Sequence, residues 1–118
     1  MALPWWLPFG SVPDVDALDL LARLSAADPP QLLDVRTAAE FASAHIQGAI
    51  NVPIARLKGQ VADLPMDRHR PVVAICLHAV RSKPAVRLLR RAGYVDVREL
   101  RGGMKGWRAA GLPVITSD

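Results

Sequence analysis

Cysteine is almost absent from this sequence, which contains one, Cys76, among its 118 residues. A single cysteine cannot form a disulfide within the chain. This fits a reducing compartment, so we expect a cytoplasmic location. The lack of a second cysteine also has a chemical consequence: any group carried on Cys76 must be removed by an acceptor outside the chain.

Long apolar runs are also missing, although 51% of the residues are hydrophobic. The first ten residues, MALPWWLPFG, are apolar but too short to cross a bilayer, and they lack the basic segment of a signal peptide. We therefore expect neither a signal peptide nor an integral membrane span. We expect residues 1–11 to form an arm whose Trp5, Trp6 and Phe9 pack on the domain or on a second subunit, or contact a partner or a membrane surface.

Acidic residues are outnumbered, with 11 against 15 basic ones and a formal charge of +4. The basic residues are scattered along the chain, apart from a cluster at Arg87, Arg90 and Arg91. Dispersed positive charge favours small anions over nucleic acid as ligands. We expect no metal site and no cofactor, because His45 has no second histidine or acidic cluster beside it.

Residues 12–118 show alternating strand and helix patterns, which predict one α/β domain with right-handed crossovers. The apolar run 71–75 lacks period-two alternation, so we expect it to be a central strand buried on both faces of a parallel sheet. The patterns predict further strands over 31–35, 49–52 and 95–100, helices over 16–24, 37–44, 82–92 and 103–110, and an irregular helical connection over 54–64.

Two helix starts have recognisable caps. Asp16 is expected to cap the first helix, and Thr37 the second. Glu40 stands at the third helical position after Thr37, so the pair predicts a capping box. We interpret Glu40 as a cap and not as a general acid.

Cys76 lies between the central strand and a helix-like segment that opens at Ser82. In parallel sheets, ligands gather at the carboxyl ends of the strands. The unpaired N–H groups of a helix N-terminus stabilise an anion there, and Arg81 adds a permanent cation. A lone cysteine can also be a buried, inert residue, but this position favours a functional thiolate.

Three motifs surround this cysteine in order: DVR at residues 34–36, HIxGAxNxP at 45–53 and GGxxxW at 102–107. Together with Cys76 and Arg81 they resemble the rhodanese-like domain family from roughly residue 12 to 115. The resemblance implies a three-layer α/β fold, with a mainly parallel sheet of about five strands and helices on both faces.

The resemblance also implies sulfur transfer. A rhodanese takes a sulfane sulfur from a donor such as thiosulfate onto its active-site cysteine as a persulfide. It then passes the sulfur to cyanide or to a thiol, including a protein thiol. Carried over to this sequence, Cys76 is the nucleophile, and the following residues form a substrate-binding cradle of backbone N–H groups: Leu77, His78, Ala79, Val80 and Arg81.

Other residues receive supporting roles from the same resemblance. Arg81 would orient the anionic end of the donor, and Ser82 would be the N-cap of the helix after the loop. Asp34, Arg36 and His45 would brace the loops at the carboxyl edge of the sheet. The alternative for Asp34 and Arg36 is a direct catalytic role.

The length and composition of the loop refine this prediction. Related phosphatases and arsenate reductases use seven residues from cysteine to arginine, whereas Cys76 to Arg81 is six, which favours sulfur over phosphate. The family usually has glycine at the position of Ala79 and often arginine at that of Leu77. If that glycine adopts a positive φ, alanine costs about 1 kcal/mol there.

These departures leave two alternatives open. One is a binding or regulatory module that keeps the fold with little turnover. The other is a persulfide carrier whose protein partner docks on the N-terminal arm. His78 either tunes the thiolate or contacts substrate, or is a solvated loop residue.

Overall fold

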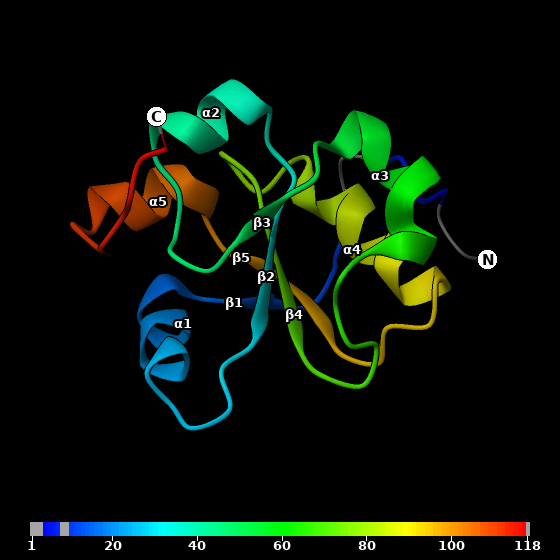
Figure 1. Ribbon diagram of the computed structural model, residues 1–118, viewed down its shortest axis with the longest axis horizontal. Helices are drawn as coiled ribbons and strands as arrows, with labels where there is room; N and C mark the ends of the chain where they lie inside the picture. Colours follow the sequence, from blue (N-terminus) through cyan, green and yellow to red (C-terminus); the bar gives the residue numbers. More distant parts are fainter. Residues whose placement is uncertain (1–3, 8–9, 118) are drawn as a thin grey trace.

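A five-stranded sheet forms the centre of the computed structural model, which describes residues 4–7 and 10–117 (Figure 1). The strand order is β1-β5-β4-β2-β3, and every neighbouring pair is parallel. The strands are β1 (Asp14–Val15), β2 (Gln31–Asp34), β3 (Ile50–Asn51), β4 (Val72–Ile75) and β5 (Val97–Leu100). The predicted parallel α/β sheet is confirmed.

The central position of β4 explains its sequence. All four of its residues are buried, because the strand is flanked by β2 and β5 and covered on both faces. Strand β1 has no counterpart among the ranges expected from the sequence. It pairs with β5 through two residues only, Asp14 with Glu99 and Val15 with Leu100, which is too short for a periodic pattern.

Helices cover both faces of the sheet, so the predicted three-layer architecture is also confirmed (Figure 1). One hydrophobic core contains residues of α3 and α4, and the other contains residues of α1 and α5. The helices are α1 (Ala17–Leu24), α2 (Ala38–Ser43), α3 (Ile54–Gln60), α4 (Ser82–Arg91) and α5 (Gly103–Ala109), with a 3-10 turn η1 (Val61–Asp63) after α3. Within the described residues, no helix is long and apolar enough to cross a membrane.

The two predicted caps are present. The Asp16 side chain accepts a hydrogen bond from the Asp19 N–H at 2.8 Å. The Thr37 hydroxyl accepts one from the Glu40 N–H at 3.2 Å, and the Glu40 carboxylate accepts one from the Thr37 N–H at 3.0 Å. This capping box fixes the start of α2 directly after the carboxyl end of β2.

Part of the N-terminal arm packs on its own domain. The partly buried Trp5 contacts the core between the sheet and α3–α4, and the Lys58 ammonium lies 5.9 Å from the centroid of its ring. The Leu7 carbonyl accepts a hydrogen bond from Arg87 on α4. Trp6 is 59% exposed, so a contact with a second subunit or partner stays a prediction. The contact expected for Phe9 lies outside the described residues.

Candidate active site

Cys76 follows the carboxyl end of the central strand, and residues 76–81 form a loop between β4 and α4. The residue is 1% exposed. Around it, His78 and Val80 are exposed, while Leu77 and Ala79 are partly buried. The structure therefore gathers the predicted cradle residues around a buried sulfur.

The Cys76 sulfur accepts a hydrogen bond at the start of α4. The Arg81 N–H donates a hydrogen bond to the Cys76 Sγ at 3.1 Å, and Arg81 is the N-cap residue of α4. The prediction that Ser82 is the N-cap is wrong: Ser82 is the first residue of the helix, and its hydroxyl donates to Glu99 Oε1 at 2.8 Å. The N–H of the N-cap residue, which has no partner inside the helix, therefore donates to the cysteine sulfur.

The start of α5 holds the first half of the loop. The Met104 N–H donates to the Cys76 carbonyl at 2.7 Å, and the Lys105 N–H donates to the Leu77 carbonyl at 3.0 Å. Gly103 permits this approach: its φ is +57°, and a Cβ built on it would lie 2.5 Å from both carbonyl oxygens. The GGxxxW motif thus provides a helix start that can lie directly against the cysteine loop.

Ala79 has a positive φ, the conformation that the glycine usual in the family at this position would allow. Its φ is +59°, and it is the one residue other than glycine with a positive φ in the part of the chain that the structure describes. The left-handed region disfavours alanine relative to glycine by about 1 kcal/mol. The loop therefore carries local strain next to the sulfur.

Arg81 forms a two-pronged ion pair with Glu40. The guanidinium donates to the two carboxylate oxygens at 2.7 and 3.0 Å. Hydrogen bonding by Arg81, helped by Thr37 and opposed by burial, lowers the pKa of Glu40 from 4.5 to about 2. The same pairing raises the pKa of Arg81, with a smaller contribution from the nearby Cys76. Glu40, the acidic member of the capping box of α2, consequently fixes the arginine beside the sulfur in place.

The sequence did not reveal this second role of Glu40. Its capping role is visible from the three-residue spacing to Thr37, whereas Arg81 lies 41 positions away. The one available signal was topological: β2 and β4 are adjacent parallel strands, so the segments after them meet at the same edge of the sheet.

Asp34 and Arg36 form a buried ion pair behind the loop. Arg36 Nη2 lies 2.7 Å from Asp34 Oδ2, and the two side chains are 4% and 0% exposed. Arg36 also donates to the Ala44 carbonyl at 2.7 Å, and the Asn51 amide donates to the carbonyls of Asp34 and Arg36. These bonds connect the ends of β2, α2 and β3.

His45 lies at the end of α2 and contacts the framework. Its Nδ1 is 2.7 Å from the Phe41 carbonyl, so this nitrogen carries a proton and donates. The ring stacks on Phe41 at 3.7 Å between centroids, and the His45 backbone pairs with Ile115. Over the described ranges, no group of three or more histidine, cysteine or acidic side chains is placed to hold a metal ion.

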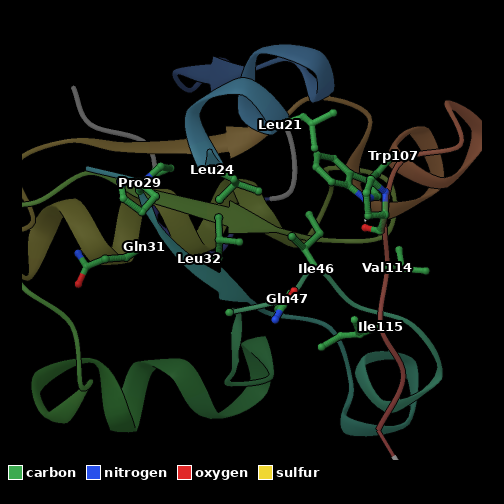
Figure 2. A pocket seen from close by; sticks show the side chains of 13 residues that line it. Leu21, Leu24, Pro29, Gln31, Leu32, Ile46, Gln47, Trp107, Val114 and Ile115 are labelled. Carbon is green, nitrogen blue, oxygen red and sulfur yellow. Dashed lines mark hydrogen bonds between the residues drawn. The ribbon is translucent and has the colours of Figure 1, made fainter. Parts of the chain in front are cut away.

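An apolar pocket of about 450 Å³ lies elsewhere, beside α1, the start of β2 and the C-terminal segment (Figure 2). Leu21, Leu24, Ile46, Trp107 and Val114 are among the residues that line it. It opens near the amino end of β2, whereas Cys76 follows the carboxyl end of β4, and it contains no residue of the loop 76–81. The Cys76 sulfur therefore does not belong to this pocket.

Two proteins of known name are similar to this chain in sequence. A protein named sulfurtransferase from Allochromatium vinosum is 34% identical over 91% of this chain and 98% of its own length. The HTH-type transcriptional regulator Rv0324 of Mycobacterium tuberculosis is 43% identical over 89% of this chain but 46% of its own length. The chain thus spans about half of the regulator and nearly all of the sulfurtransferase.

A solved structure and a family model agree on the fold. The crystal structure of the Alr3790 protein from Anabaena sp. has a TM-score of 0.79 and 33% identity, and the match covers 87% of this chain and 92% of that one. The model of the rhodanese-like domain matches residues 16–110, which include every strand from β2 to β5 and the whole cysteine loop. The chain belongs to the rhodanese-like domain family.

Proposed function

We propose that this protein is a sulfurtransferase that carries sulfur as a Cys76 persulfide. The observation that supports the proposal best is the 3.1 Å hydrogen bond from the Arg81 N–H to Sγ at the start of α4. A donor at this position stabilises a thiolate, which is the nucleophile of the reaction. The similarity to the A. vinosum sulfurtransferase supports the same chemistry.

The reaction has two displacements. The Cys76 thiolate attacks the sulfane sulfur of thiosulfate, an S–S bond forms, and sulfite leaves with the electron pair of the broken bond. Cyanide or a thiolate acceptor, which can be a protein thiol, then attacks the outer sulfur and releases the Cys76 thiolate. The reducing cytoplasm is the location that we propose, because it keeps both thiols available.

The residues around Cys76 bind the donor or hold the site in position. In this proposal the backbone of residues 77–81 binds the anionic donor, and Arg81 attracts its negative end from the position fixed by Glu40. Asp34, Arg36 and His45 are positioning residues, because their hydrogen bonds connect framework segments and none of them bonds to Cys76. His78 is exposed at the entrance and contacts the incoming substrate.

A second candidate function is a regulatory domain with low turnover, or a persulfide carrier served by one protein partner. The similarity to about half of a protein named as an HTH-type transcriptional regulator favours it. The exposed Trp6 on the arm would be the contact for such a partner.

Intact mass spectrometry tests the proposal. Wild-type protein treated with thiosulfate should gain one sulfur atom, about 32 Da, and cyanide should remove it with release of thiocyanate. The Cys76→Ser variant should show no gain. If wild type gains no mass from thiosulfate or mercaptopyruvate while its thiol still reacts with iodoacetamide, the small-molecule sulfurtransferase is excluded and the second candidate is favoured.

A further inference from the structure

The strained residue of the cysteine loop has a charged neighbour that none of the family motifs includes. Lys83, in the first turn of α4, places its Nζ 3.0 Å from the Ala79 carbonyl oxygen. An ammonium group that donates to a carbonyl forms a charge-assisted hydrogen bond, which is stronger than a neutral one. The bond therefore holds the carbonyl group of Ala79, the loop residue whose left-handed conformation is unfavourable for alanine.

A buried carboxylate fixes Lys83 in this orientation. Lys83 Nζ lies 2.7 Å from Glu99 Oε2, and the two side chains are 22% and 5% exposed. The other carboxylate oxygen of Glu99 accepts the Ser82 hydroxyl at 2.8 Å. Both oxygens of Glu99 are thus occupied by the first turn of α4, so the lysine has a defined partner on each side.

The geometry of the peptide unit carries this restraint toward the sulfur. The C=O and N–H groups of a trans peptide point in opposite directions. When Lys83 holds the Ala79 carbonyl, the Val80 N–H of the same unit must point away from Lys83. The next residue, Arg81, donates its N–H to Sγ. If the Ala79 carbonyl were released, this peptide unit could rotate. The rotation would displace the neighbouring Arg81 N–H, which donates the hydrogen bond to Sγ.

We propose that Lys83, oriented by Glu99, is a positioning residue that holds Ala79 in its left-handed conformation and so keeps the Arg81 N–H against the Cys76 sulfur. The lysine compensates in this chain for the glycine that the family usually has at this loop position. The expected effect of Lys83 on sulfur transfer rests on the proposed function. Its effect on thiol reactivity is independent of sulfur transfer.

The test is a double-mutant cycle of Lys83→Met and Ala79→Gly. Methionine keeps an unbranched side chain at position 83 but removes the ammonium group. Glycine at position 79 adopts a positive φ without strain, so the loop no longer needs the bond from Lys83. The first readout is the pH dependence of Cys76 alkylation by iodoacetamide. The second is kcat/KM for thiosulfate.

Lys83→Met should move the alkylation midpoint to higher pH and lower kcat/KM about fivefold, the factor that corresponds to the conformational preference at Ala79. Added to Lys83→Met, Ala79→Gly should restore most of both values. Glu99→Gln should shift both readouts in the same direction by a smaller amount, since Lys83 loses the carboxylate that orients it but keeps the ammonium that donates to Ala79. Lys58→Met, the same substitution at a lysine that contacts the Trp5 ring, is the control and should leave both unchanged.

Two results would overturn the inference. If Lys83→Met leaves the alkylation profile unchanged, the hydrogen bond from Lys83 to the Ala79 carbonyl has no effect on the sulfur. If the double variant is as impaired as Lys83→Met alone, the lysine acts on the thiolate directly through its charge. Should Lys83→Met fail to fold by circular dichroism, Glu99→Gln with and without Ala79→Gly gives the same comparison. An inactive wild type would reject the proposed function, while the alkylation profiles would still decide on Lys83.

Discussion

The two halves of the cysteine loop are held by different kinds of contact. The carbonyls of Cys76 and Leu77 accept backbone N–H groups from α5, and the fit depends on the missing side chain of Gly103. The second half depends on charged side chains, with Ala79 bound by Lys83 and Arg81 bound by Glu40. Backbone contacts in a close-packed region do not titrate, whereas ion pairs respond to pH and salt. The first half is therefore a fixed support, and the second half is the adjustable part.

The largest effect should come from Gly103→Ala, which breaks the fixed half. The new Cβ would lie 2.5 Å from two carbonyl oxygens at a φ of +57°, so α5 must move away from the loop. We expect the free energy of unfolding to fall by about 3 kcal/mol, with a large loss of sulfur transfer. Urea denaturation and thiosulfate kinetics measure the two effects.

Gly106→Ala is the matched control on the same helix. Its Cβ would meet the Arg101 carbonyl oxygen at 3.9 Å, an ordinary contact. In a helix interior, alanine is favoured over glycine by up to about 1 kcal/mol, so this variant should be as stable as wild type or more so. Equal destabilisation by the two variants would show that the close approach of α5 to the loop is not what restricts position 103.

Glu40→Gln should have an intermediate effect on the adjustable half. Glutamine can keep part of the capping box but loses the charge that binds Arg81. Because the two side chains are 30% and 29% exposed, we expect a stability loss of about 1 kcal/mol. We expect a fall of about tenfold in kcat/KM for thiosulfate, since the guanidinium loses its fixed position.

Thr37→Val separates the two roles of Glu40. It removes the capping hydroxyl, which also costs about 1 kcal/mol, but it leaves the carboxylate and its bond to Arg81 in place. We expect a similar loss of stability with much less loss of activity. If Thr37→Val lowers kcat/KM as much as Glu40→Gln, the contribution of Glu40 comes from the start of α2 and not from Arg81.

The smallest effect should appear in the dependence of stability on pH. The pKa of Glu40 is lowered from 4.5 to about 2 in the folded protein. Its charge therefore contributes fully to stability above about pH 5, and this contribution is lost as pH falls through 4.5 toward 2. The difference in unfolding free energy between wild type and Glu40→Gln should shrink steadily between pH 5 and pH 3 in urea titrations. A constant difference over that range would contradict the ion pair.

Sequence patterns predicted contacts between residues that are close in the chain. They did not predict contacts between side chains that only the fold brings together. The capping box of Thr37 and Glu40 was predictable because three residues separate them, and the condition on Ala79 followed from the family's glycine. The partnership of Glu40 with Arg81 spans 41 residues, and that of Lys83 with Glu99 spans 16. No local pattern encodes either of these pairs.

Two further differences have equally physical causes. Ser82 looked like an N-cap because serine is a preferred capping residue, but the helix begins at Ser82 itself, and its hydroxyl donates to the buried carboxylate of Glu99. Strand β1 escaped prediction because two residues cannot show an alternation. Its place in the sheet is fixed by pairing with β5 and by the ion pair of Asp14 with Arg101.

The burial of Cys76 has a consequence for the proposed persulfide, because an acceptor could attack either of its two sulfur atoms. In the proposed persulfide, the added sulfur would stand about 2 Å beyond Sγ, whereas Sγ itself belongs to a residue that is 1% exposed. Attack on the inner atom would attach the acceptor to the protein and expel hydrosulfide. Attack on the outer atom completes the transfer and regenerates the enzyme. In the proposed reaction, the burial of Cys76 would thus direct the second displacement to the outer sulfur.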